Sequence, residues 1–189
     1  MAEKTGVSIG IAVQAIDLRL VTENVSIPVF GQHFDFSDLG AFTGHTTAQS
    51  LKDAGAYGTL LNHAERKLAI DVLEKSINQA REVGLFTIVC AESTFTANAV
   101  VELDPDLVAI EPPELIGGNI SVCSADPQLI RDAVEMVGQG KVLVGAGIKT
   151  ADDVRMSLQY GANGILVSSV VTKALDPEKA LAELLLGFK

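Results

Sequence analysis

One stretch of the chain decides its fold class: residues 57–90 read YGTLLNHAERKLAIDVLEKSINQAREVGLFTIVC. Tyr57–Leu61 and Leu85–Cys90 are short, continuously apolar runs, which are typical of parallel strands covered on both faces. Between them, apolar side chains recur at helical spacing over Lys67–Val83. A strand, a helix and a second strand in this order predict a parallel βαβ unit.

The same alternation continues in both directions. Further strands are predicted at the apolar runs Val7–Val13, Ile27–Gly31, Leu107–Ile110, Lys141–Val144 and Gly164–Val167. Further helices are predicted at Thr46–Ala54, Thr94–Leu103, Pro127–Val137, Ala151–Tyr160 and Pro177–Leu186. Asp126 and Asp176 each precede a Pro as capping residues should, and Gly84, Gly138 and Gly161 stand where helices should end. No linker divides the chain, so residues 1–189 are predicted to form a single α/β domain.

Composition excludes several classes of function. The 189 residues carry 14 Lys and Arg against 24 Asp and Glu, a net charge of −10 that repels nucleic-acid phosphates. Cys90 and Cys123 are too few for a disulfide framework and are predicted to be buried free thiols. The apolar runs are too short for a membrane span or a signal peptide, so we expect a soluble, cytoplasmic protein with no membrane partner.

The first candidate site residue is His63, which follows the strand Tyr57–Leu61 and precedes the longest predicted helix. A neutral imidazole there is able to donate a hydrogen bond to a substrate carbonyl. The alternative is an ordinary loop histidine with a structural partner.

The second candidate is Glu111, which ends the strand Leu107–Ile110. Partial burial at such a strand end raises the pKa of a carboxyl toward the working range of a general base. Pro112 and Pro113 stiffen the following segment and Gly117-Gly118 loosens it, which is the pattern of a hinged lid. The alternative is a solvent-exposed acid beside a turn.

The third candidate is the glycine turn Gly145-Ala146-Gly147, whose backbone N–H groups are able to approach an anion before the next helix. Ser168, Ser169 and Val170 follow the last strand and offer hydroxyl and amide groups to the same anion. Helix capping is the alternative for the two serines. Chemistry-bearing residues after several different strands favour a TIM (β/α)8-type barrel over a doubly wound sheet.

The loop between Gly31 and Thr46 is long enough to suggest a binding element. Phe42 and Thr43, flanked by glycines, suggest a tip that inserts into a partner subunit. His33, Asp35 and His45 match no standard metal-ligand spacing, so no metal is expected.

Taken together, these motifs resemble the archaeal-type triosephosphate isomerases in order and spacing. The resemblance rests on five segments: Gln32-His33, Phe42–His45, Leu61–Glu65, Ile110–Gly117 and Gly145–Ile148. It implies a barrel enzyme of glycolysis and gluconeogenesis that interconverts dihydroxyacetone phosphate and glyceraldehyde 3-phosphate through an enediolate, without cofactor.

The resemblance also implies the residue roles. Glu111 is the proton-shuttling base and His63 the neutral electrophile, with Glu65 supporting His63. The phosphate is held at the following positions: Ile116, Gly117, Gly145, Ala146, Gly147, Ser168, Ser169 and Val170. The Phe42-Thr43 loop is the expected contact in a homo-oligomer, either a dimer or a tetramer.

Three departures from the family pattern lead to a further expectation. The family begins with a strand ending in Asn-x-Lys, so about seven βα units are expected here, with the first unit missing; Lys4 does not replace that lysine. Ala64 stands where the family has serine, and Val170 where it has glycine. We therefore expect these 189 residues alone to show at most trace isomerase activity. The rival interpretations are a non-catalytic relative that binds a phosphorylated ligand or acts as a scaffold, and another phosphate-binding barrel enzyme.

Overall fold

The computed structural model describes residues 5–38, 40–118 and 120–189. Lys4 lies outside the described residues. The chain forms two compact units: one comprises Ile9–Val89 and Leu103–Asp106, and the other comprises Met1–Ser8, Cys90–Glu102 and Leu107–Lys189.

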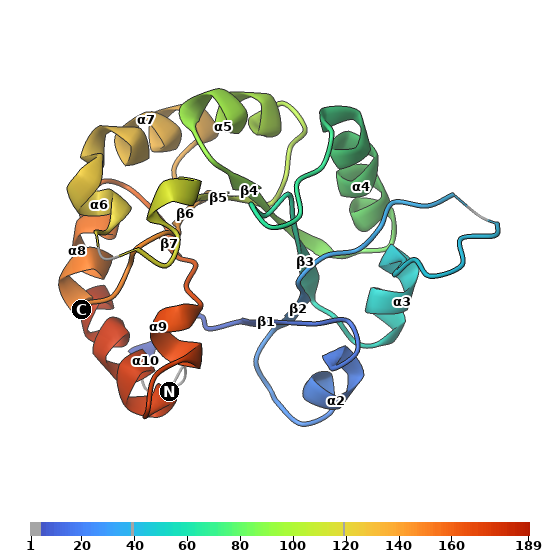
Figure 1. The fold of residues 1–189 in the computed structure, drawn as a ribbon, viewed down its shortest axis with the longest axis horizontal. Helices are drawn as coiled ribbons and strands as arrows, with labels where there is room; N and C mark the ends of the chain where they lie inside the picture. The colour runs from blue at the N-terminus through green and yellow to red at the C-terminus, as the bar shows by residue number, and fades with distance from the viewer. Residues whose placement is uncertain (1–4, 39, 119) are drawn as a thin grey trace. The chain divides into compact units, whose positions relative to one another are not determined.

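The first unit contains the amino-terminal strands (Figure 1). Its strands are β1 (Ile11–Val13), β2 (Val29–Gly31), β3 (Gly58–Leu61) and β4 (Phe86–Ala91, whose last two residues belong to the second unit). Each strand pairs in parallel with the next, and the registers include Ile11↔Val29, Phe30↔Gly58 and Gly58↔Phe86. The predicted order of parallel strands is confirmed, although β1 begins four residues after Val7 because its pairing with β2 starts at Ile11.

Helices α2 (Leu18–Thr22), α3 (Ala48–Asp53) and α4 (Ile70–Glu82) connect these strands. The α3 helix is capped by Thr47, whose side chain accepts a hydrogen bond from the Ser50 N–H at 3.1 Å. Leu51, Leu61, Leu73, Ile77 and Val89 are at most 1% exposed and form the core of this unit. Burial of such aliphatic side chains is the main stabilising contribution.

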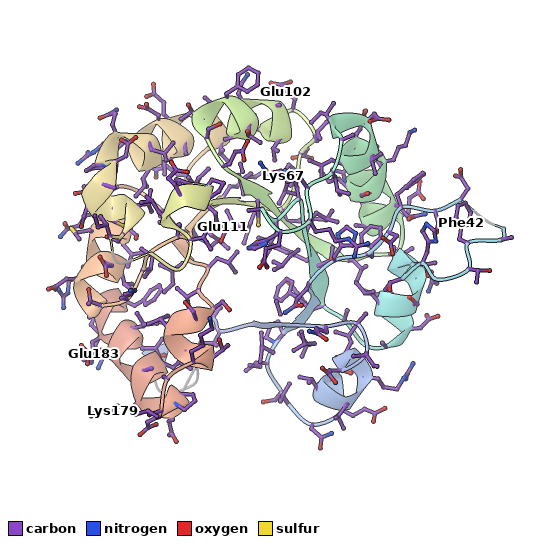
Figure 2. The ribbon with its side chains drawn as sticks, in the orientation of Figure 1. Phe42, Lys67, Glu102, Glu111, Lys179 and Glu183 are labelled. Carbon is purple, nitrogen blue, oxygen red and sulfur yellow. The ribbon has the colours of Figure 1, made fainter. Side chains whose placement is uncertain are left out.

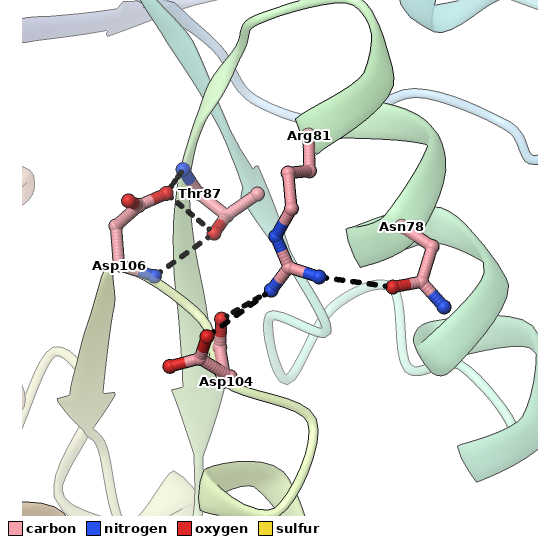
Figure 3. Close-up of polar contacts among 5 residues, drawn as sticks. All are labelled: Asn78, Arg81, Thr87, Asp104 and Asp106. Atoms are coloured by element: carbon pink, nitrogen blue, oxygen red, sulfur yellow. Dashed lines mark hydrogen bonds and ion pairs between the residues drawn. The ribbon is translucent and has the colours of Figure 1, made fainter.

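Polar contacts fix the segment Leu103–Asp106 to β4 (Figure 3). Asp106 Oδ2 accepts hydrogen bonds from the Thr87 N–H at 2.7 Å and from Thr87 Oγ1 at 2.9 Å. On the exposed side, Arg81 of α4 donates to the carbonyl of Asp104 at 2.8 Å. The buried Thr87 N–H therefore has its partner in a side chain from a segment 19 residues away.

The second unit contains the remaining strands, β5 (Leu107–Ile110), β6 (Val142–Val144) and β7 (Gly164–Ile165). They also pair in parallel and in chain order, with Val108↔Val142 and Leu143↔Gly164 in register. The helices of this unit are α5 (Thr94–Val101), α6 (Val122–Ala125), α7 (Pro127–Val137), α8 (Ala151–Gln159), α9 (Ser169–Thr172) and α10 (Pro177–Leu185), with short 3-10 turns at Pro113–Leu115 and Leu186–Phe188.

The predicted helix boundaries of this unit are confirmed where capping residues set them. Asp126 accepts from the Leu129 N–H at 3.1 Å and Asp176 from the Lys179 N–H at 3.0 Å, each with Pro in the first helical turn. Gly138 ends α7 at a φ of 101°. In the ranges that the structure describes, no helix is long and apolar enough to cross a membrane.

Candidate active site

The His63 turn begins where β3 ends. Asn62 has a φ of 59°, a left-handed conformation that Asn tolerates, and it turns the chain sharply away from the strand. The Asn62 Oδ1 accepts a hydrogen bond from the Leu68 N–H at 3.0 Å and closes the turn. The prediction that a helix begins near Lys67 is wrong: α4 begins at Ile70, because this closed turn uses the preceding residues.

Backbone contacts fix the protonation pattern of the His63 ring. Its Nδ1 accepts a hydrogen bond from the Glu65 N–H at 3.2 Å. A backbone N–H only donates, so Nδ1 carries no proton and the proton of the neutral ring is on Nε2. His63 is 26% exposed at its side chain and therefore presents one N–H donor from a half-buried position.

Glu65 contacts the same ring mainly through its backbone. Its carboxylate is 90% exposed and lies 3.6 Å from His63 Nδ1, which is beyond a good hydrogen bond. The hydrogen bond of residue 65 to the ring is therefore made by its backbone N–H. Ala64, between them, is half-buried.

Glu111 follows β5 and is 7% exposed (Figure 2). Its backbone N–H donates to the Ala91 carbonyl at 2.9 Å, which fixes the start of its side chain relative to the end of β4. The Cys90 thiol is beside the Glu111 carboxyl: burial, and then the negative charge and hydrogen bonding of Glu111, raise the pKa of Cys90 well above its usual value. The alternative of a solvent-exposed acid is wrong, because this carboxylate is buried.

The segment after Glu111 contains prolines, which restrict the backbone, followed by glycines, which do not. Pro112 is buried and Pro113 opens a 3-10 turn that ends at Leu115. Gly117 has a φ of 69° and nothing within 4 Å of where a side chain would stand. Ile116, beside it, is 38% exposed. These features leave the tip of the segment open to solvent while its start is held.

The turn Gly145-Ala146-Gly147 follows β6 in the same unit as Glu111. Gly145 donates its N–H to the Ile110 carbonyl at 3.0 Å, so the turn is fixed to the end of β5. Gly147 has a φ of 73°, and a β-carbon there would stand 2.7 Å from Ser121 Cα. Only glycine fits this position, because the backbone of the turn lies against the backbone of Ser121.

Residues after β7 form the short helix α9. Ser168 is the N-cap residue of α9, but its side chain makes no capping hydrogen bond. Helix capping therefore accounts for the place of Ser168 at the start of the helix but not for a role of its hydroxyl group. Ser169 and Val170 lie in the first turn of α9. Val170 has no positive φ, and a helical turn accepts its branched side chain where the family pattern has glycine.

The long loop between β2 and α3 holds the remaining candidates. His33 Nε2 lies 3.5 Å from Asp35 Oδ1, whereas the His45 ring packs edge-on against Phe42 with centroids 5.5 Å apart. Figure 2 shows Phe42 on the part of this loop that extends beyond α3. In the parts of the chain that the structure describes, no three His, Cys, Asp or Glu side chains form a metal-binding group.

The structure adds two residues to the surroundings of Glu111 that sequence reasoning did not connect with it, Cys90 and Gly145. Cys90 was predicted only to be a buried free thiol, and that prediction is confirmed, as it is for Cys123. Cys90 ends a predicted strand and Gly145 directly follows one. This position at the carboxyl end of a strand is the sequence signal that could have placed both residues near the site.

Comparisons with known proteins agree with this arrangement. The triosephosphate isomerase family model matches residues 1–184. A triosephosphate isomerase of Methanocaldococcus jannaschii is 44% identical over 189 residues, which cover 98% of this chain and 86% of that protein. The corresponding protein of Methanosarcina acetivorans is 43% identical, with 98% and 85% covered. That of Methanothermobacter thermautotrophicus is 42% identical, with 97% and 82% covered.

The family match confirms the predicted TIM-barrel fold class, and the parallel strands of each unit are consistent with it. It also covers both candidate strand ends, since His63 and Glu111 lie within the matched residues. This chain therefore belongs to the triosephosphate isomerase family.

Proposed function

We propose that the chain catalyses the interconversion of dihydroxyacetone phosphate and glyceraldehyde 3-phosphate, with Glu111 as the base. The observation that carries this proposal is the environment of Glu111: a carboxylate only 7% exposed, directly after a strand, between a buried thiol and a glycine. A buried carboxylate placed at the end of a parallel strand is a strong candidate for proton abstraction.

The proposed reaction transfers protons and needs no electron acceptor. The Glu111 carboxylate removes a proton from C1 of dihydroxyacetone phosphate; the electron pair of that C–H bond forms the C1–C2 double bond of the enediolate, and the π pair of the C2 carbonyl moves onto its oxygen. A proton then moves from the C1 oxygen to the C2 oxygen, and return of the Glu111 proton to C2 forms the C1 aldehyde and regenerates the carboxylate. The balance involves no cofactor or metal.

His63 is proposed to stabilise the oxygen on which negative charge develops. Because Nδ1 accepts from the Glu65 N–H, the proton of the neutral ring is on Nε2, and Nε2–H is the proposed donor. A preorganised neutral donor of this kind contributes roughly 3–4 kcal/mol of transition-state stabilisation. A neutral ring also avoids transferring its proton too early, since it is a weaker acid than imidazolium.

The phosphate is proposed to bind backbone N–H groups of the turn 145–147 and of Ser168–Val170, with Ile116 and Gly117 completing the site when the segment 112–118 closes. Ala146 and Gly147 have left-handed φ values of 67° and 73°, so the backbone turns sharply at these residues, and backbone N–H groups of such turns are known to bind anions. Closure excludes water, which protects the enediolate from losing phosphate.

We also propose that residues 1–189 act as one domain, that the Phe42-Thr43 loop joins copies into a homo-oligomer, and that the protein works in the cytoplasm. The exposed position of Phe42 supports the proposed homo-oligomer, because a 36% exposed aromatic ring on a loop tip is a common anchor at interfaces.

The function is tested by NMR detection of isomerisation and of deuterium uptake from D2O, measured over hours against the protein-free reaction. We expect His63→Gln to bring the rate down to that of the protein-free reaction, because loss of one oxyanion donor costs about 10²–10³-fold and the wild-type rate is itself expected to be only a trace. Glu82→Gln, which changes an exposed acid at the end of α4, is the control and should keep the wild-type rate. Equal rates for His63→Gln and wild type would contradict the role of His63. A wild-type rate no higher than background would favour a non-catalytic relative.

A further inference from the structure

Asp35 joins both ends of the long loop that carries Phe42. Its backbone N–H donates to the Thr46 carbonyl at 2.7 Å, and its Oδ2 accepts from the Thr46 N–H at 2.9 Å. The other carboxylate oxygen, Oδ1, forms an ion pair with Arg66 and lies 3.5 Å from His33 Nε2. One half-buried carboxylate thus contacts the start of the loop, the end of the loop and a residue from the turn after β3.

Arg66 is part of the turn that fixes His63. Its backbone N–H donates to the His63 carbonyl at 2.8 Å. The neighbouring Glu65 N–H is the donor to His63 Nδ1. A carboxylate that holds the Arg66 side chain therefore acts on a turn whose other contacts set the position and tautomer of the imidazole.

The loop is packed against the unit at its base and exposed at its tip. Phe34 is fully buried, and Gln79 of α4 donates to the Ser37 carbonyl at 2.7 Å. By contrast, residues 40–45, which include Phe42, are exposed. Asp35 stands at the boundary between these two parts, where both chain directions of the loop are paired with each other.

The partners of Asp35 favour the ionised form of its carboxyl group. Burial acts to raise its pKa, but hydrogen bonding from the Thr46 N–H and the positive charge of Arg66 outweigh burial, so the pKa is lowered. Asp35 is therefore ionised at neutral pH. Removing the charge changes the ion pair while leaving the side-chain volume almost unchanged.

We infer that Asp35 is a positioning residue: through Arg66 it holds the turn 63–66, and with it the His63 imidazole, at a fixed position relative to the base of the Phe42 loop. The inference rests on the proposed role of His63 and adds a determinant outside the reacting groups. The Phe42 loop and His63 are then linked by one continuous series of contacts through Asp35 and Arg66. An exposed ion pair adds little to overall stability, so the expected effect is on geometry.

The three histidines of the chain suit a direct test, because each reports a different part of this connection. His33 contacts Asp35, His45 lies on the loop tip, and His63 is on the turn. Imidazole nitrogen NMR of the full chain, assigned with single His→Gln variants, gives the tautomer of each ring. Wild type should show His63 as a single form protonated on Nε2. This measurement needs no catalytic activity, so failure of the proposed function leaves it interpretable.

Asp35→Asn keeps an oxygen acceptor for the Thr46 N–H and removes the charge that holds Arg66. We expect the His63 signals to lose the single-tautomer pattern, and the thermal midpoint to stay close to wild type. Arg66→Gln should give the same His63 change. Arg66→Lys retains a cation and should keep part of the wild-type His63 pattern. If Arg66 acted only through its packing, Arg66→Lys and Arg66→Gln would change the pattern equally.

Asp104→Asn is the matched control. It removes the carboxylate of another Arg–Asp ion pair, the exposed pair with Arg81, 3.5 Å long and in the same unit (Figure 3). None of the three histidines should respond to it. A wild-type His63 pattern in folded Asp35→Asn and Arg66→Gln would overturn the inference, as would an equal response to Asp104→Asn. If Asp35→Asn does not fold, the Arg66 pair of variants decides the question by the same criteria.

Discussion

The Glu111 side chain lies directly over the α-carbon of Gly145: a β-carbon at position 145 would stand 2.5 Å from Glu111 Cγ and 2.8 Å from its Cδ. Both distances are far below van der Waals contact, so any side chain at 145 forces the carboxylate to move. The identity of residue 145 therefore limits where the proposed base can be. This requirement is independent of any role of Gly145 in binding phosphate.

Gly145→Ala should consequently displace Glu111 and slow isomerisation. A displacement of about 1 Å at a reacting group costs on the order of 100-fold in rate. The measurement is the isomerisation rate, compared with that of Gly164→Ala. At Gly164 a β-carbon meets only the Leu143 side chain at 3.2 Å, so this control should remain close to wild type. Similar losses in both variants would show that the contact with Glu111 has no special effect.

The two thiols should resist alkylation in the native protein. Burial raises the pKa of Cys90, with Glu111 adding to the effect, and burial also raises the pKa of Cys123. Thiolate is the reactive form, and a free cysteine is half ionised at about pH 8.5. At that pH, iodoacetamide should modify both cysteines slowly in buffer and rapidly in guanidinium chloride. Rapid native labelling of Cys90, located by mass spectrometry, would contradict its burial beside Glu111.

Asp106 and Asp104 should differ in their contributions to stability although they are two residues apart (Figure 3). Asp106→Ala leaves the buried Thr87 N–H without its 2.7 Å acceptor, which should lower the free energy of unfolding by about 1–3 kcal/mol. Asp104→Ala removes an exposed ion pair, while Arg81 keeps the 104 carbonyl, and should cost less than about 1 kcal/mol. Denaturant titrations measure both values, and the reverse order would contradict this account.

The capping box of α8 provides a pH-dependent prediction. Burial acts to raise the pKa of Asp153, but hydrogen bonds from Ser121, the Lys149 N–H and Thr150 outweigh it and the pKa is lowered. A carboxyl with a lowered folded pKa stabilises above its unfolded value of about 3.9 and loses this contribution as the pH falls through the folded value. The stability difference between wild type and Asp153→Asn should therefore be larger at about pH 6 than at about pH 3.

Denaturant titrations at the two pH values provide that comparison, and an unchanged difference would mean that the hydrogen bonds do not favour the ionised form. Thr150→Ala tests the other half of the capping box, in which Thr150 Oγ1 accepts from the Asp153 N–H at 3.1 Å. It should cost about 1 kcal/mol at neutral pH, the usual cost of losing an N-cap side chain.

Local rules predicted those parts of the fold that local chemistry decides. The Asp-Pro starts of α7 and α10 are set by capping within three residues, and the sequence shows them directly. The short helices α2, α6 and α9 were not predicted, since four or five residues do not display a helical period. The start of α4 was misplaced because the Asn62 side chain, eight residues earlier, occupies the backbone that a longer helix would need.

The candidate site was predictable in its residue types and not in its contacts. His63 and Glu111 were identified because each lies within two residues of the end of an apolar strand. The contact of Glu111 with Gly145 joins residues that follow two neighbouring strands, and no local pattern encodes it. The Asp35–Arg66 pair joins two loops in the same way. Such contacts depend on strand register, which the sequence alone leaves open.

Deuterium uptake at C1 of dihydroxyacetone phosphate in D2O, measured with wild-type protein, Glu111→Gln and Glu114→Gln, tests whether Glu111 is the base. Glu114 is the exposed carboxylate of the same segment and serves as the control. Uptake above the protein-free reaction by wild type and Glu114→Gln, lost in Glu111→Gln with the binding of inorganic phosphate retained, is the predicted result. Uptake by Glu111→Gln at the wild-type rate, or no uptake by wild type, would contradict the account.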